Sequence, residues 1–168
     1  MDIGILLLRL AIGLTLAAHG TQKLFGWFGG GGLDKTGEGL ARLGFHPGRR
    51  HALAAGLVEV SAGVLLAAGL LTPIAAMLVG SLMLVAAISV HVKQGFFITS
   101  GGYEYNLVLG IAGLSLAFTG AGALSADALL GFDLSGVLWG IGASLLAVLG
   151  AAVQLAQRRT PAHAVTAA

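Results

Sequence analysis

Residues 73–92 read PIAAMLVGSLMLVAAISVHV, a stretch of twenty residues without Asp, Glu, Lys or Arg. An α-helix rises about 1.5 Å per residue, so a stretch of this length covers the roughly 30 Å hydrocarbon core of a bilayer. Pro73 has no amide proton and suits the first helical turn, where that proton would have no partner. The stretch therefore predicts a membrane-spanning helix that begins at Pro73.

Four further apolar segments flank this stretch, two on each side. Two precede it, at residues 3–21 and 52–71, and two follow it, at residues 105–120 and 136–154. Only Thr72 separates the second and third spans, which predicts a tight helical hairpin. With a mean hydropathy of +0.93 and only 10% charged residues, the pattern indicates an all-α, polytopic membrane helix bundle in the lipid bilayer.

The predicted organisation has three parts. Residues 1–130 hold the first four spans as one membrane domain, residues 131–157 hold a fifth, C-terminal span, and residues 158–168 form a disordered cytoplasmic tail. The first span begins Met1-Asp2 without a basic segment and ends without a small-residue cleavage site. We therefore expect a retained helix there rather than a signal peptide.

Two connecting segments have the pattern of short helices. A glycine hinge at residues 29–32 precedes leucines interspersed with charges, which predicts a short interfacial helix between the first two spans. A second short helix is predicted at residues 125–132, with Ser125 or Asp127 as its N-cap. Glycine makes up 28 of the 168 residues, and small residues let helices pack closely in lipid, either within the bundle or in a homo-oligomer.

Charges are divided unequally between the two sides of the predicted bundle. With five spans, one side carries Asp2, Asp127 and Asp133 and neither Lys nor Arg. Because Lys and Arg concentrate on the cytoplasmic side of short loops, we expect a cell membrane protein with its N-terminus outside and its C-terminus in the cytoplasm. The cytoplasmic side then carries Lys23, Lys35, Arg42, Arg49, Arg50, Lys93, Arg158 and Arg159.

The chain contains no cysteine, which excludes disulfides, a thiol nucleophile and cysteine-bound iron–sulfur clusters within it. A redox reaction would therefore use a group from another molecule. The net charge is only +2, so the high isoelectric point reflects few charges, and nucleic acid is not an expected partner. The sequence also lacks a phosphate-binding loop, a dinucleotide-binding motif and a GxSxG motif.

Two ionisable side chains lie inside predicted spans. Arg9 is six residues into the first span from its outer end, and Glu59 is seven residues into the second span from its inner end. Such groups are costly in lipid unless they are paired or face a wet cavity, so we predict that Arg9 and Glu59 pair, directly or through water. The pair would either fix the register of the bundle or form a polar core that holds a head group or relays protons.

Further polar residues gather at one depth, near the cytoplasmic ends of the spans. Imidazole, carboxylate and phenol groups at such a rim suit proton-coupled chemistry on a quinone, although polar residues there also serve as membrane anchors. The candidate catalytic residues are Arg9, Glu59, His19, His91 and Glu104. The candidate residues for binding a quinone head group are His19, Gln22, Tyr103, Tyr105 and Asn106.

A pair of histidines raises the alternative of a haem or a metal ion. His19 and His91 end different spans at matching depth, as a bis-histidine haem would require. No two histidines have the i, i+4 spacing of a helical metal site, so no metal site is predicted. His46, His51 and His163 fall in predicted loops or the tail and are not candidates.

These segments, taken in order, resemble the DoxX family of small bacterial and archaeal membrane proteins. The resemblance covers residues 8–127 and implies a four-helix membrane domain in a prokaryotic cell membrane, to which the fifth span is an addition. Its marks are Arg9-Leu10 with Gly13, HGTQKLFG at 19–26, Glu59 with Gly63, GLLTP at 69–73, GGYEYN at 101–106 and GAGALSAD at 120–127, in which Ala121 replaces the usual proline.

The resemblance also implies a function. Related proteins have been assigned as membrane subunits of a thiosulfate:quinone oxidoreductase or linked to redox and sulfur-stress complexes. It therefore implies a membrane oxidoreductase subunit that interacts with quinone or relays protons and has a soluble redox protein as partner. Two alternatives remain: a non-catalytic anchor that recruits a soluble enzyme through residues 34–50, and a small-solute transporter, which the lack of an inverted repeat disfavours.

Overall fold

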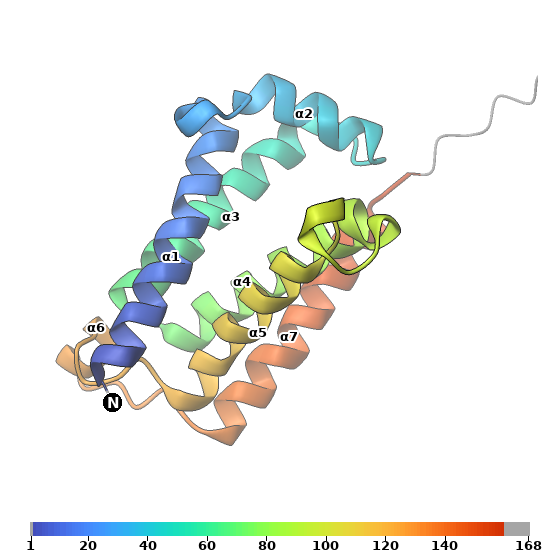
Figure 1. Ribbon diagram of the computed structural model, residues 1–168. Coiled ribbons are helices and arrows are strands. Elements are labelled where there is room, and N and C mark those ends of the chain that lie inside the picture. The colour runs from blue at the N-terminus through green and yellow to red at the C-terminus, as the bar shows by residue number, and fades with distance from the viewer. Residues whose placement is uncertain (1, 160–168) are drawn as a thin grey trace, which may run out of the picture.

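The computed structural model describes residues 2–159, and every regular element in this range is helical (Figure 1). The all-α bundle expected from the sequence is confirmed. The α-helices are α1 (Asp2–Phe25), α2 (Gly32–Arg42), α3 (Gly48–Ala68), α4 (Thr72–Ala86), α5 (Glu104–Thr119), α6 (Ala126–Leu129) and α7 (Val137–Ala156). Single turns of other helix types cover Trp27–Gly29, Ala87–His91, Val92–Gln94 and Ile98–Ser100.

Four helices are long and apolar enough to cross a membrane. They are α1, α3, α7 and the continuous helix Thr72–Gln94, which extends α4. The remaining apolar helix, α5, has 16 residues, so its axis is about 24 Å long and shorter than a hydrocarbon core. Length and composition thus support four of the five predicted spans, while α5 runs beside α4 in the bundle (Figure 1).

Glycines bring α1 and α3 into backbone contact. A Cβ at Gly13 would overlap Gly63 and Ala67, and a Cβ at Gly20 would overlap Gly56 and Val60. These pairs set an antiparallel register in which the first half of α1 faces the second half of α3. The glycine pattern of the second span therefore serves packing inside the chain.

The bundle consists of two groups of helices, with α1, α2 and α3 on one side and α4, α5 and α7 on the other (Figure 1). Within the second group, Gly113 of α5 lies against Val79 of α4, and Gly140 of α7 lies against the ring of Phe118. The two groups share one apolar core. It is formed by Ile12, Leu16, Ala62, Leu66, Ala75, Val79, Met83 and Leu116.

The end of the bundle that holds the N-terminus is closed by the hairpin between α3 and α4. Gly69 and Leu71 both have positive φ, at 64° and 49°, which lets the chain reverse within a few residues. The Asp127 carboxylate accepts hydrogen bonds from Leu71 N (2.7 Å), Thr72 N (3.0 Å) and Thr72 Oγ1 (2.7 Å). The predicted short helix is confirmed as α6, and its N-cap is Ser125, whose hydroxyl accepts from Ala128 N.

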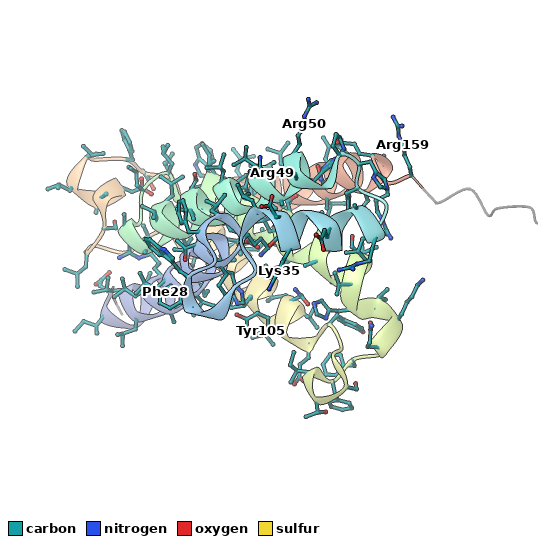
Figure 2. The ribbon with its side chains drawn as sticks, turned by 90° about the horizontal axis from the view of Figure 1, so that it is seen from above. Phe28, Lys35, Arg49, Arg50, Tyr105 and Arg159 are labelled. Atoms are coloured by element: carbon teal, nitrogen blue, oxygen red, sulfur yellow. The ribbon has the colours of Figure 1, made fainter. Side chains whose placement is uncertain are left out.

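The opposite end of the bundle carries the basic residues of α2, of the start of α3 and of the segment after α7. Figure 2 looks onto α2 at this end and shows Arg50 and Arg159 pointing outward. Arg159 N donates to Gly44 O (2.8 Å), and the Arg158 guanidinium donates to Leu43 O (3.0 Å) and lies over the ring of Phe45. Of the predicted tail, these two arginines therefore pack on the connection between α2 and α3, while residues 160–168 and His163 lie outside the described residues.

Candidate functional site

The predicted pair of Arg9 and Glu59 does not form. Arg9 is 1% exposed, and its guanidinium donates to Leu124 O at the N-terminal end of the bundle, whereas its Nε and Nη1 atoms have no partner. Helical side chains lean toward the N-terminus of their own helix. Because α1 and α3 are antiparallel, Arg9 leans toward the N-terminal end of the bundle and Glu59 leans toward the basic end. The predicted pairing of Arg9 with Glu59 was therefore wrong.

Glu59 pairs instead with Lys23 near the basic end. Lys23 Nζ lies 2.6 Å from each carboxylate oxygen, and the Glu59 side chain is 9% exposed while that of Lys23 is 29% exposed. The tilt of helical side chains toward the N-terminus of their own helix explains this pair. Lys23 on α1 leans into the bundle while Glu59 on α3 leans toward the basic end, so the two side chains meet. Lys23 thus compensates a buried charge rather than extending into the head-group region as an anchor.

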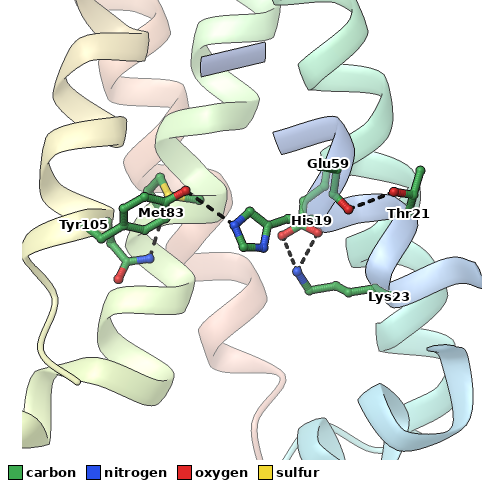
Figure 3. Close-up of polar contacts among 8 residues, drawn as sticks. His19, Thr21, Lys23, Glu59, Met83 and Tyr105 are labelled. Atoms are coloured by element: carbon green, nitrogen blue, oxygen red, sulfur yellow. Dashed lines mark hydrogen bonds and ion pairs between the residues drawn. The ribbon is translucent and has the colours of Figure 1, made fainter. Parts of the chain in front are cut away.

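A second polar contact joins α1 to α5. His19 lies one helical turn before Lys23, and its Nε2 is 3.4 Å from the hydroxyl of Tyr105. The two rings meet edge to face, with centroids 6.2 Å apart. Figure 3 shows the His19 ring directed at Tyr105 and Lys23 reaching Glu59. We call His19, Lys23, Glu59 and Tyr105 the polar layer.

Asn106 and Tyr103, two of the predicted head-group residues, line a separate cavity of about 400 Å³ between α4, α5 and α7. Asn106 is 6% exposed. Its Nδ2 makes a weak contact with Met83 Sδ at 3.8 Å, and its Oδ1 has no partner. The cavity therefore contains one amide with unused hydrogen-bonding capacity.

Three other candidates hold loops at the basic end instead of joining the polar layer. His91 Nδ1 is 2.7 Å from Gly101 O, and the Glu104 carboxylate accepts from Ile98 N at 3.0 Å. Gln22 Nε2 donates to Phe28 O at 3.2 Å. Among residues 2–159, no three His, Asp or Glu side chains lie close enough together to hold a metal ion.

Two polar contacts were not anticipated. Asp127 forms the clamp on the α3–α4 hairpin, although the sequence suggested only a helix cap. His51 was placed in a loop, but α3 begins at Gly48, and His51 Nδ1 lies 3.1 Å from Gln154 Nε2 of α7. Pro47, which directly precedes α3, was the available signal for this earlier start.

A helical bundle with four membrane-length helices and an ion pair inside its spans defines a polytopic membrane protein. The sequence model of the DoxX family matches residues 4–92, and the chain belongs to this family. It is 30% identical over 126 residues to a Bacillus subtilis (strain 168) protein described as "Putative oxidoreductase CatD", an alignment covering 75% of this chain and 86% of that protein. No solved structure matches the chain significantly.

Proposed function

We propose that this chain is the membrane subunit of a quinone-linked oxidoreductase in a redox or sulfur-metabolism complex and that its polar layer relays protons. The observation that carries this proposal is the buried carboxylate of Glu59, bonded to Lys23 beside the His19–Tyr105 contact. Ionisable residues inside spans are rare and costly, and they are functional candidates by default. Membership of the DoxX family and similarity to a protein described as a "Putative oxidoreductase" support a redox role.

In the proposed reaction, this chain transfers protons and a partner protein supplies electrons. Reduction of a quinone to a quinol consumes two electrons and two protons. The chain has no cysteine that could carry the electrons as a thiol, and in this proposal a soluble redox partner supplies them. Imidazole, ammonium and carboxylate groups are the kinds of side chain that serve in proton transfer, and His19, Lys23 and Glu59 place one of each near the basic end of the bundle.

The test compares two variants that each neutralise one carboxylate. Native membranes are assayed for decylubiquinone reduction by the soluble cell fraction, with thiosulfate, sulfide and NADH tried in turn as donors. Glu59→Gln lowers the chain-dependent rate by about tenfold or more, since general acid–base groups contribute at least that much. Asp133→Asn, at an exposed residue of the opposite end, leaves the rate unchanged. A folded Glu59→Gln protein with the full rate, or no chain-dependent reduction with any donor, refutes the proposal.

A second candidate function is that of a non-catalytic anchor. It is favoured by the exposed surface where α2 meets the start of α3, at which Asp34 of α2 and Arg49 of α3 form an ion pair (2.9 Å) with side chains 82% and 69% exposed. A soluble enzyme could bind this charged surface. In the assay above, an anchor gives an unchanged rate in Glu59→Gln and a lower rate when α2 charges are reversed.

For the location, we propose the cell membrane of a prokaryote, with the N-terminus outside and the C-terminus in the cytoplasm. The support is the placement of α2, Arg158 and Arg159 at one end of the bundle and of the N-terminal Asp2 and α6 at the other (Figures 1 and 2). Basic residues favour the cytoplasmic side.

A further inference from the structure

The cavity between α4, α5 and α7 has the size of a small-molecule site and faces the surroundings of the bundle. Its volume of about 400 Å³ falls within the range of roughly 300–1,000 Å³ for ligand pockets. Large apolar side chains of its lining are exposed, including Ile88 (46%), Leu107 (42%) and Ile111 (59%). In a bilayer these residues meet lipid, so a molecule dissolved in the membrane can enter sideways.

Within this apolar lining, Asn106 is the feature that points to a ligand. Its side chain is buried, its Oδ1 has no partner, and its Nδ2 has only the 3.8 Å contact with sulfur. A buried amide without partners costs about 1–3 kcal/mol, and most such groups in folded proteins are satisfied. A ligand with an oxygen at its end can engage both atoms of the amide in turn, because Nδ2 donates to the carbonyl of a quinone and Oδ1 accepts from the hydroxyl of a quinol.

The backbone beside the cavity is also unusual. α4 continues into a π-helical turn at Ala87–His91, and Ala87 and Ile88 of this turn line the cavity. π-helical turns are rare and occur frequently at functional sites. The turn is independent of the Asn106 side chain, and both are located at the same cavity.

We propose that this cavity binds the head group of an isoprenoid quinone, with Asn106 as its hydrogen-bonding partner. This inference rests on the proposed function, and it places the binding site for the quinone substrate in this cavity. The lining contains no Lys, Arg, Asp or Glu, so it suits an uncharged head group rather than a lipid phosphate or a fatty-acid carboxylate. Asn106 follows Tyr105 in α5, which connects the site to the polar layer.

The direct test uses the wild-type protein in phosphatidylcholine liposomes with an azido derivative of decylubiquinone. After illumination, mass spectrometry locates the labelled peptides. The site predicts labels on the cavity-lining parts of α4, α5 and α7, and excess decylubiquinone should abolish them. Labels confined to α1 around His19, or labels that decylubiquinone does not compete away, overturn the inference.

Variants separate binding from stability. Asn106→Leu removes an unsatisfied polar group, so the protein should unfold at the same or a higher temperature while its affinity for decylubiquinone falls about tenfold. Leu107→Trp should block the mouth of the cavity, whereas Leu53→Trp, at a residue of equal exposure on α3 (43%) and outside the cavity, should not. Unchanged affinity in both Asn106→Leu and Leu107→Trp overturns the inference.

The failure of this inference differs from that of the proposed function. If Glu59→Gln abolishes quinone reduction but the cavity variants bind and turn over quinone normally, the quinone site lies elsewhere and the proposed function holds. If the cavity binds decylubiquinone but no donor drives its reduction, the proposed function fails and the binding site remains.

Discussion

Gly69 is required where Arg9 crosses the end of α3. A Cβ at this position would overlap Arg9 Nη1, and the backbone φ is +64°. We expect Gly69→Ala to destabilise the protein by about 3 kcal/mol, because alanine pays roughly 1–2 kcal/mol in this conformation and the bond from Arg9 to Leu124 O is displaced. Thermal unfolding in detergent micelles measures the change. Gly39→Ala is the control, since nothing lies within 4 Å of its added Cβ, and an equal midpoint for both variants would contradict the prediction.

The pair of Lys23 and Glu59 provides a double-mutant cycle. Lys23→Met leaves the Glu59 carboxylate buried without its cation, and we expect a loss of about 2 kcal/mol, reduced by the partial exposure of the lysine. Adding Glu59→Gln should restore part of the stability, because the uncompensated charge is then gone. The cycle is measured by unfolding in mixed micelles. Additive losses in the double variant would show that the two side chains are not coupled.

At the residue scale, the sequence indicated which polar side chains lie inside the bundle better than it indicated which of them meet. Arg9, Glu59 and His19 were singled out because polar groups inside spans are costly. The pairing of Arg9 with Glu59 was inferred from depth alone, which ignores the direction in which helical side chains lean. Applied to two antiparallel helices, that direction separates Arg9 from Glu59 and brings Lys23 to Glu59.

The α3–α4 hairpin depends on a contact from a distant element. Asp127 accepts three hydrogen bonds from Leu71 and Thr72, and Leu71 has a positive φ of 49° that is unfavourable for leucine. Asp127→Ala leaves these donors without partners, so we expect a loss of about 3 kcal/mol and faster hydrogen exchange at the Leu71 and Thr72 amides. Asp133→Ala, at an exposed residue, should change stability by less than about 0.5 kcal/mol. Slow exchange that persists in Asp127→Ala would refute the clamp.

Element positions followed from hydropathy, but element ends and special turns did not. The predicted second span began at residue 52 because the basic residues before it were assigned to a loop, although α3 begins at Gly48. The π-helical turn at Ala87–His91 has no distinct signal in an apolar stretch. Asn106 was recognised as polar, but its cavity depends on how three helices pack, which the sequence of one helix does not show.

At the scale of the molecule, the bundle separates its ionisable contacts from its apolar cavity. Ionisable residues connect α1, α3 and α5 close to the basic end, while the apolar cavity opens between α4, α5 and α7. Tyr105 and Asn106 are consecutive residues of α5. Tyr105 belongs to the polar layer, and Asn106 lines the cavity. The proposed proton relay and the proposed quinone site are therefore adjacent through α5.

The orientation of the bundle can be tested cleanly because the chain has no cysteine of its own. Single-cysteine variants Ser100→Cys, Leu129→Cys and Gln157→Cys change no Lys or Arg, and all three residues are exposed. They flank α5 and α7, so a membrane-impermeant maleimide applied to right-side-out vesicles should label Leu129→Cys alone. The other two variants should react only after the vesicles are opened.

Each departure from this pattern has its own meaning for the topology. Labelling of Leu129→Cys and Ser100→Cys from the same side would show that α5, with its 16 residues, does not cross and that the bundle has four spans. Labelling of Leu129→Cys and Gln157→Cys from the same side would show the same for α7. A fully inverted pattern would mean that the basic end faces outward, against the charge rule. We expect none of these, because a short apolar helix packed along α4 can still cross if the bilayer thins locally at a cost of a fraction of a kcal/mol per Å.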